Sequence, residues 1–470
     1  MDLIRRPVFT GRMTFPQQLR HKILSNAIRV LYAVPLYLML QTAVAADLKL
    51  VGDWQIQVTE KRPRFLRSAE TVSAILTIEP SAEREARFER YDSLPVFQPT
   101  APVWAGEGTV LRSLRTSETS SDGMLIAESL HIYKNNIDTT LTLQAGKDYG
   151  LDANWAVIGR LPGGAILDGK PVFASYLFYQ SRLDAVVMNR RHEIIIRQGS
   201  PTNTVAVLPP LEKGDKLLAS IWVPGRLARL TENNLFPILE TKYPEPTKPH
   251  PSQAELRIPK SLKKLRDGQP IRILAWGDSV TDAGYLPHPE TERWQSQFIA
   301  HLKARFPKAH IELITEAWGG RTTGSYLAEP PGSLHNYKEK VLAAKPDLIV
   351  SEFVNDAGLP PVQVQEIYPK LLADFRSIGA EWIILTPHYV RPDWMGLTRQ
   401  RDIDNDPRPY VIGLRQFAAE NPVGLADASK RWGRLWRQGV PYTTLFMNSI
   451  NHPNARGMSI FADSLMELFP

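Results

Sequence analysis

The 470-residue chain contains no cysteine, which excludes a scaffold stapled by disulfides and any metal site built on thiolates. It also lacks a Walker A run, a Gly-x-Gly-x-x-Gly sequence and a His-Glu-x-x-His sequence, which mark many nucleotide and zinc sites. Its composition is otherwise that of a globular protein, with 43% hydrophobic and 22% charged residues. We therefore expect a globular protein that folds without disulfides.

The chain has a net charge of +7, and a positive net charge is typical of proteins that bind nucleic acids. The distribution of the charges along the chain argues against this interpretation. Residues 1–45 hold six Lys and Arg residues against a single acid, Asp2. The rest of the chain is close to neutral, so the sequence predicts no nucleic-acid partner.

Residues 1–45 have the order of a secretory signal peptide. A cationic stretch ends at Arg29, the eleven apolar residues VLYAVPLYLML follow at 30–40, and an Ala-Val-Ala triplet ends at Ala45. Eleven residues interrupted by Pro35 fall short of the roughly 20 that span a bilayer. We predict cleavage after Ala45, a secreted or periplasmic location, and no stable membrane insertion of the mature protein.

The character of the chain changes near residue 240. Residues 46–240 contain short runs rich in β-branched and aromatic residues between turn residues, which predicts an all-β accessory domain, a sandwich or a barrel-like module. Residues 241–270 contain six prolines among several lysines, which predicts an extended linker. Residues 271–470 alternate apolar strand-like runs with amphipathic helices. This pattern predicts a doubly wound α/β domain with a parallel sheet, whose ligands gather at the carboxyl ends of the strands.

Three segments that follow predicted strands of this domain supply the groups that acyl transfer needs. The first strand leads into Gly-Asp-Ser, where Ser279 offers a nucleophilic hydroxyl and a backbone N–H. A glycine loop after the second strand contains Gly320, and the third strand is followed by Asn355. We predict that the N–H groups of Ser279 and Gly320 and the Asn355 carboxamide stabilise an oxyanion.

A serine nucleophile needs a general base, and several histidines follow Ser279 in the chain. His452 lies in a loop directly before the last predicted helix, from which its side chain can fold back over the strand ends. His388, after the fourth strand, is the second candidate base and otherwise a candidate substrate-binding residue. Trp318 lies beside the glycine loop and could line a pocket, where its aromatic face would suit a sugar ring.

These residues resemble the SGNH, or GDSL-type, hydrolase superfamily over residues 271–470. The resemblance consists of four blocks in order, Gly277-Asp278-Ser279, Gly320, Asn355-Asp356 and His452-Pro453-Asn454. It implies a three-layer α/β/α flavodoxin-like domain, Ser279 as nucleophile and His452 as base. It also implies an oxyanion hole made by Ser279, Gly320 and Asn355, and a site with no metal or organic cofactor.

The sequence departs from the family at the residue that orients the base. The family usually has an Asp three residues before its His, a position that Ser449 occupies here. Asn448 lies one residue further back, and we predict that it or a backbone carbonyl accepts a hydrogen bond from the imidazole of His452. A triad completed from elsewhere in the chain is the alternative.

The sequence therefore predicts a secreted serine esterase that removes acyl groups, in particular acetyl groups, from a small-molecule or carbohydrate ester. Two alternatives stay open. The same residues could pass the acyl group to a polysaccharide hydroxyl, which would make the protein an O-acyltransferase. The missing Asp could instead mark a non-catalytic carbohydrate-binding protein.

Overall fold

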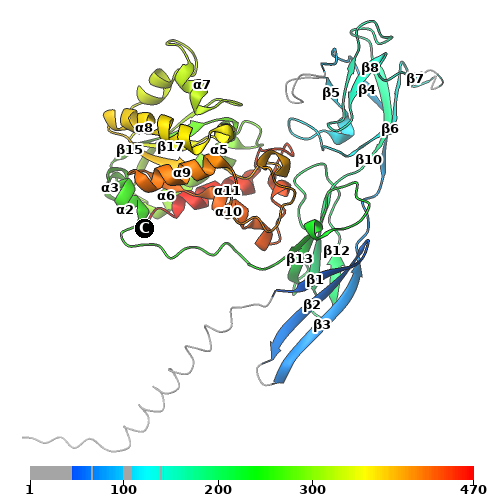
Figure 1. Ribbon diagram of the computed structural model, residues 1–470, viewed down its shortest axis with the longest axis horizontal. Coiled ribbons are helices and arrows are strands. Elements are labelled where there is room, and N and C mark those ends of the chain that lie inside the picture. The colour runs from blue at the N-terminus through cyan, green and yellow to red at the C-terminus, as the bar shows by residue number, and fades with distance from the viewer. Residues whose placement is uncertain (1–44, 65–66, 99–107, 138–139, 141) are drawn as a thin grey trace, which may run out of the picture. The chain divides into compact units, whose positions relative to one another are not determined.

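The apolar runs between residues 270 and 426 form five parallel strands in the computed structural model of the chain (Figure 1). The structure describes residues 45–64, 67–98, 108–137, 140 and 142–470, so the predicted signal peptide lies outside the described residues except for Ala45. The strands are β15 (Pro270–Gly277), β16 (His310–Ala317), β17 (Leu348–Glu352), β18 (Glu381–Leu385) and β19 (Gly424–Ala426).

The spatial order of these strands is β16-β15-β17-β18-β19. The first strand in the chain therefore lies between the second and third, as in flavodoxin-like doubly wound sheets. In such a sheet the connections reverse direction between β15 and β17, and a crevice opens at their carboxyl ends. The predicted α/β class is confirmed.

Helices cover both faces of the sheet, which explains why its strands are apolar on both sides. Alternate residues of β15 divide between two cores: Ile273 and Ala275 belong to one, Leu274 and Trp276 to the other. The first core also takes in α3 (Pro259–Asp267), α6 (Trp294–Arg305) and α11 (Ala455–Met466). The second takes in α8 (Pro361–Ser377) and α9 (Pro409–Glu420).

Shorter helical elements connect these parts. The α-helical ones are α2 (Gln253–Arg257), α4 (Ser279–Asp282), α5 (Pro289–Glu292), α7 (Thr323–Ala328) and α10 (Ala428–Gly433). The others are η3 (Arg112–Leu114), η4 (Glu232–Asn234), η5 (Lys338–Leu342), η6 (Val354–Gly358), η7 (Pro392–Met395), η8 (Leu435–Arg437) and η9 (Tyr442–Leu445).

The region before residue 240 consists of antiparallel sheets, as the sequence predicts. In the described residues these sheets have the orders β1-β2-β3, β4-β10-β6-β7, β5-β9-β8 and β12-β11-β13-β14. The strands are β1 (Asp47–Gly52), β2 (Gln55–Arg64), β3 (Arg67–Thr77), β4 (Arg84–Tyr91), β5 (Thr109–Val110), β6 (Leu125–Tyr133), β7 (Thr142–Leu143), β8 (Tyr149–Asp152), β9 (Val157–Arg160), β10 (Val172–Phe178), β11 (Arg182–Met188), β12 (Ile194–Arg197), β13 (Lys216–Val223) and β14 (Leu235–Pro237).

Two separate apolar cores hold these sheets together. One joins Ile56 and Val58 of β2 to Val186 of β11 and Ile221 of β13. The other joins strands of the remaining two sheets. The β-rich region therefore has two apolar cores, where the sequence predicts one sandwich or barrel-like module.

Residues 241–270 are not extended throughout, which corrects the linker prediction. Their second half forms α2 and α3. Ser252 begins α2 with a capping box, in which the N–H of Ser252 donates to Glu255 Oε2 at 2.7 Å and the N–H of Glu255 donates to Ser252 Oγ at 3.2 Å. Pro259 occupies the first turn of α3, where no N–H partner is needed. Proline here marks a helix start, so the α/β domain begins near Ser252.

We expect the α3 segment to contribute to stability as a core element. Leu265 is fully buried against the sheet, so Leu265→Ala should lower the free energy of unfolding by about 2–5 kcal/mol. Lys263 lies on the exposed side of the same helix, and Lys263→Ala should change that free energy by about 0.5 kcal/mol or less. Urea unfolding of the two variants measures the difference. Equal effects would mean that the segment is a linker after all.

Candidate active site

A tight turn at the end of β15 presents Ser279. A Cβ at Gly277 would lie 2.1 Å from Thr281 Oγ1 and 2.3 Å from the carbonyl oxygen of Glu352, so only glycine fits there. Ser279 then begins α4, where its N–H has no helical acceptor. The turn leaves both the hydroxyl and the N–H of Ser279 at the carboxyl end of the sheet.

His452 reaches Ser279 from the loop before α11. The distance between His452 Nε2 and Ser279 Oγ is 3.0 Å. The ring of Tyr285 stacks on the imidazole, with centroids 4.1 Å apart and planes 5° apart. His452 is 8% exposed, and both the stacking on Tyr285 and the contact with Ser279 restrict the orientation of its ring.

The second ring nitrogen of His452 contacts a residue that the sequence analysis did not select. His452 Nδ1 is hydrogen-bonded to Glu118 Oε2, and the two residues lie 334 positions apart in the chain. Glu118 belongs to the loop between η3 and β6 of the β-rich region. The order hydroxyl, imidazole, carboxylate is that of a Ser-His-acid triad.

The loop that carries Glu118 is fastened to the loop that carries His452. The N–H of Ser117 donates to the carbonyl of Met447 at 3.3 Å, and Thr119 Oγ1 donates to the carbonyl of Asn448 at 2.7 Å. Thr119 is almost fully buried. These bonds on both sides of Glu118 fix the position of its carboxylate.

Asn448 does not contact the imidazole, contrary to the prediction that it orients His452. Its Oδ1 accepts hydrogen bonds from the N–H groups of Ile450, Asn451 and His452 at 2.9–3.0 Å. Its Nδ2 donates to Glu118 Oε2 at 3.3 Å. Asn448 therefore shapes the loop and supports the carboxylate, as a positioning residue.

The three predicted oxyanion donors face one cavity with Ser279. Gly320 has a φ of +71°, which favours glycine. The N–H and the Nδ2 of Asn355 each donate to Asp278 Oδ2 at 2.9 Å. Because the amide nitrogen carries two hydrogens, one remains for an oxyanion.

Three buried carboxyl groups lie close to these residues in the chain or in space: Asp278, Glu352 and Asp356. Burial raises the pKa of Asp278 to about 7 and that of Asp356 to about 6, and it raises the pKa of Glu352 well above its ordinary value. The N–H groups of Asn355 favour the charged form of Asp278. The cluster therefore carries less than its full charge at neutral pH, and Asp278 keeps the acceptor that orients Asn355.

The cavity at Ser279 has a volume of about 650 Å³. It is lined by Glu118, Thr119, Ser279, Gly319, Gly320, Arg321, Asn355, Trp394, Asn448, Ile450, Asn451 and His452. Trp394, 49% exposed, supplies an aromatic face, and Ile450 is the aliphatic residue of the lining. The walls are otherwise polar and come from both the β-rich region and the α/β domain.

A family model agrees with this geometry. Residues 275–460 match the model of the GDSL-like lipase/acylhydrolase family. The chain therefore contains a GDSL-like lipase/acylhydrolase domain over these residues, as the sequence resemblance implies.

Several solved structures are similar to part of the chain. A two-domain esterase active on acetylated mannans is 16% identical, with 45% of this chain and 52% of that chain covered and a TM-score of 0.36. This chain thus matches about half of that esterase. An acetylxylan esterase from Geobacillus stearothermophilus is 20% identical, with 43% and 94% covered and a TM-score of 0.32. A G-D-S-L family protein from Veillonella parvula is 20% identical, with 42% and 97% covered and a TM-score of 0.31. No curated protein sequence matches the chain significantly.

The described part of the chain contains no helix that is long and apolar enough to cross a membrane. It also contains no group of three or more His, Asp or Glu side chains placed to hold a metal ion.

Trp318, predicted to bind substrate, lies behind the cavity wall of the GDSL-type domain. Its ring stacks on His335 with centroids 4.6 Å apart. The guanidinium of Arg321 lies over the same ring at 4.9 Å, and Arg321 is the residue that lines the cavity. Trp318 therefore supports a lining residue, and Trp394 is the aromatic residue that faces the cavity.

His388 also lies away from the cavity, which corrects its predicted role in substrate binding. It is fully buried, with the rings of Trp432, Phe446 and Phe461 around it. Burial lowers the pKa of His388 well below its ordinary value, so the ring is neutral. Its Nε2 lies 2.7 Å from the carbonyl oxygen of Asn451, the residue before His452, and donates to it.

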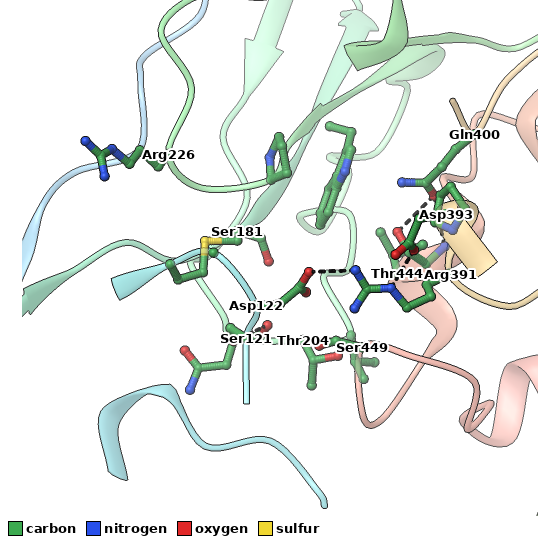
Figure 2. Close-up of a pocket in the computed structure, with 18 residues that line it drawn as sticks. Ser121, Asp122, Ser181, Thr204, Arg226, Arg391, Asp393, Gln400, Thr444 and Ser449 are labelled. Atoms are coloured by element: carbon green, nitrogen blue, oxygen red, sulfur yellow. Dashed lines mark hydrogen bonds and ion pairs between the residues drawn. The ribbon is translucent and has the colours of Figure 1, made fainter. Parts of the chain in front are cut away.

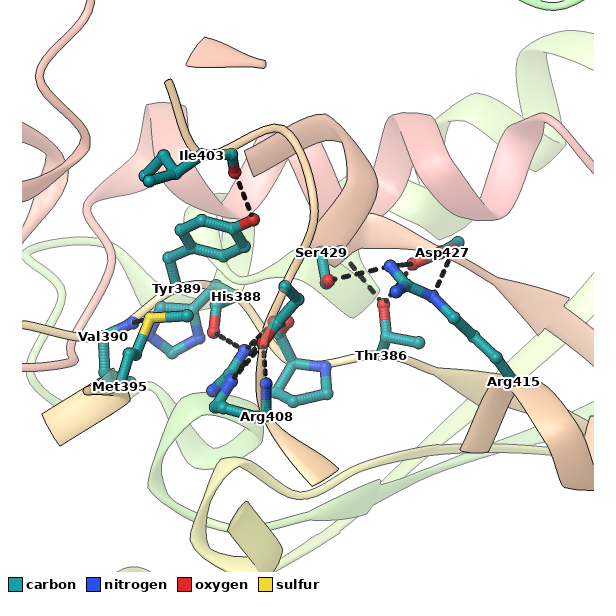
Figure 3. A network of polar contacts seen from close by, with 12 residues as sticks. Thr386, His388, Tyr389, Val390, Met395, Ile403, Arg408, Arg415, Asp427 and Ser429 are labelled. Atoms are coloured by element: carbon teal, nitrogen blue, oxygen red, sulfur yellow. Dashed lines mark hydrogen bonds and ion pairs between the residues drawn. The ribbon is translucent and has the colours of Figure 1, made fainter. Parts of the chain in front are cut away.

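Figure 3 shows how the segment around His388 is itself held. Arg408 Nη2 donates to the carbonyl of His388 at 2.7 Å, and its guanidinium pairs with the buried Asp406. Arg408 therefore holds the backbone of His388, and the His388 ring in turn holds the loop that carries His452. It is a positioning residue, not a base.

The carboxylate of Glu118 should matter for turnover more than for binding. In Glu118→Gln the imidazole loses its anionic partner, and we expect kcat to fall about 10²–10⁴-fold with little change in KM. Glu128→Gln, on the exposed side of β6, is the matched control and should leave both constants unchanged. Steady-state kinetics with an aryl acetate measure this. A wild-type kcat in Glu118→Gln would remove Glu118 from the site.

The hydrogen bond from His388 should be separable from its packing. His388→Leu fills the apolar space without a donor, and we expect kcat to fall about tenfold because the carbonyl of Asn451 loses its partner. His388→Gln retains an N–H donor and should recover part of that loss at similar thermal stability. If the two variants have the same kcat, His388 serves packing alone.

Proposed function

We propose that the protein is a serine esterase that hydrolyses short acyl esters, in particular acetyl esters, of sugars or similar polar alcohols. The observation that carries the proposal is the continuous hydrogen-bonded path from Glu118 through His452 to Ser279 Oγ, beside three oxyanion donors. A non-catalytic binding protein has no need of such a path.

Acylation follows from this geometry. Ser279 Oγ attacks the ester carbonyl carbon while His452 Nε2 takes its proton. The carbonyl oxygen becomes an oxyanion, which accepts hydrogen bonds from the N–H groups of Ser279 and Gly320 and from the Asn355 carboxamide. His452 then protonates the leaving alcohol oxygen, and the acyl group stays on Ser279. Glu118 holds the imidazole in the required tautomer and stabilises its charged form.

Deacylation reverses these roles. A water molecule gives its proton to His452 Nε2 and attacks the acyl carbon, and Ser279 leaves with the proton that His452 returns. An alcohol in place of the water would yield acyl transfer by the same steps.

The lining of the cavity favours a short acyl group and a polar alcohol. A long acyl chain gains affinity by burying apolar surface, at about 25 cal/mol per Å². Ile450 and Trp394 are the large apolar side chains of the lining, whereas Arg321, Asn451 and Thr119 offer hydrogen-bonding groups. The Trp394 ring can stack against the apolar face of a sugar. We also propose that the protein is exported, because residues 1–45 have the charge and hydropathy pattern of a signal peptide.

The proposal is tested by comparing aryl acetate with aryl octanoate. We expect kcat/KM to be higher for the acetate by at least about tenfold, because Ile450 and Trp394 are the only large apolar side chains among the lining residues that could hold a longer chain. Ser279→Ala should abolish turnover and labelling by a fluorophosphonate, while thermal unfolding stays within a few degrees. Faster hydrolysis of the octanoate would contradict the short-acyl proposal. Product analysis with added oligosaccharide separates hydrolysis from acyl transfer.

A further inference from the structure

A second cavity, of about 360 Å³, lies where loops of the β-rich region meet loops of the GDSL-type domain (Figure 2). The β-rich region contributes residues 121–124 and 203–205 and the ring of Trp222. The GDSL-type domain contributes residues 391–393 and Gln400, among others. Ser279 and His452 are not part of it.

The two cavities share a wall. Ser449 lines the second cavity, while its neighbours Asn448 and Ile450 line the catalytic one. Likewise, Asp393 lines the second cavity and its neighbour Trp394 lines the catalytic one. The two cavities are therefore separated by side chains of residues adjacent in the chain.

Two basic and two acidic side chains line the second cavity. Arg391 Nη2 lies 3.3 Å from Asp122 Oδ2, and Arg391 Nε donates to Asp393 Oδ1 at 2.5 Å. Arg226 is the second basic residue of the lining and lies on the opposite side in Figure 2. The cavity therefore has no net charge, which disfavours phosphate, sulfate or an anionic sugar as its ligand.

The neutral groups suit a ligand with many hydroxyls. Gln400 Oε1 accepts hydrogen bonds from the N–H and the Oγ1 of Thr443 at 3.0 and 2.9 Å, which leaves its Nε2 as a donor. Asp122 and the hydroxyl of Ser449 offer acceptors. The half-buried ring of Trp222 adds an aromatic surface. Donors, acceptors and one aromatic ring together match a neutral sugar unit.

We propose that this cavity is a subsite for a further sugar unit of the same neutral oligosaccharide whose ester group is hydrolysed at Ser279. This inference rests on the proposed function and narrows its substrate class to chains of several sugars. It also gives the β-rich region a role in substrate recognition, since this region supplies 11 of the 18 residues that line the cavity.

The test measures how activity depends on chain length. We expect kcat/KM of the wild-type protein to rise from acetylated mono- to hexasaccharides of the xylose and mannose series. Gln400→Glu keeps the acceptor for Thr443 but loses the N–H donor, and Asp122→Asn exchanges one acceptor for a donor. Each should lower the ratio of kcat/KM for the hexasaccharide to that for the monosaccharide about tenfold. Gln363→Glu, the same change on the exposed side of α8, is the matched control and should leave the ratio unchanged.

The outcomes separate this inference from the proposed function. Hydrolysis of aryl acetate without any dependence on sugar chain length overturns the subsite and leaves the esterase standing. If the protein hydrolyses no ester, the esterase proposal fails. Calorimetry with unmodified xylohexaose and mannohexaose then decides the subsite: binding that weakens in Gln400→Glu supports it, and equal or absent binding overturns it.

Discussion

The hydrogen bond between Glu118 and His452 is the contact on which the organisation of the site depends. It joins a loop of the β-rich region to the loop before α11, and it is flanked by the bonds of Ser117 and Thr119 to Met447 and Asn448. A carboxylate beside an imidazole is useful only if its position is fixed to a fraction of an ångström. The β-rich region is therefore part of the site itself, and not only an appendage to a self-sufficient hydrolase domain.

The geometry of the parallel sheet explains which residues of the site could be predicted from the sequence. Ser279, Gly320 and Asn355 follow three neighbouring strands, and the carboxyl ends of parallel strands meet at one edge. His452 precedes a helix that packs on the same sheet. Local sequence was enough for these four because each lies within a few residues of an element with a clear apolar pattern.

Glu118 could not be found in the same way. It lies in a Ser- and Thr-rich loop without regular structure, and its position opposite His452 arises from the packing of two regions that are distant in the chain. The errors at His388 and in residues 241–270 have a related cause. A histidine near a strand end can point into the core as readily as into a cavity, and a proline-rich segment can contain helix starts. Burial and capping, which decide both cases, are properties of the folded chain.

The position of the acid also explains the serine at residue 449. Ser449 adopts a φ of +62°, and it lines the second cavity rather than approaching the imidazole. Because Glu118 is hydrogen-bonded to His452 Nδ1, Ser449 does not need to orient the imidazole. A small hydroxyl there leaves the second cavity open, whereas a carboxylate would add an unpaired charge to a wall whose charges are balanced. The serine at residue 449 and the participation of the β-rich region thus have the same cause, which is that the carboxylate bonded to His452 comes from Glu118.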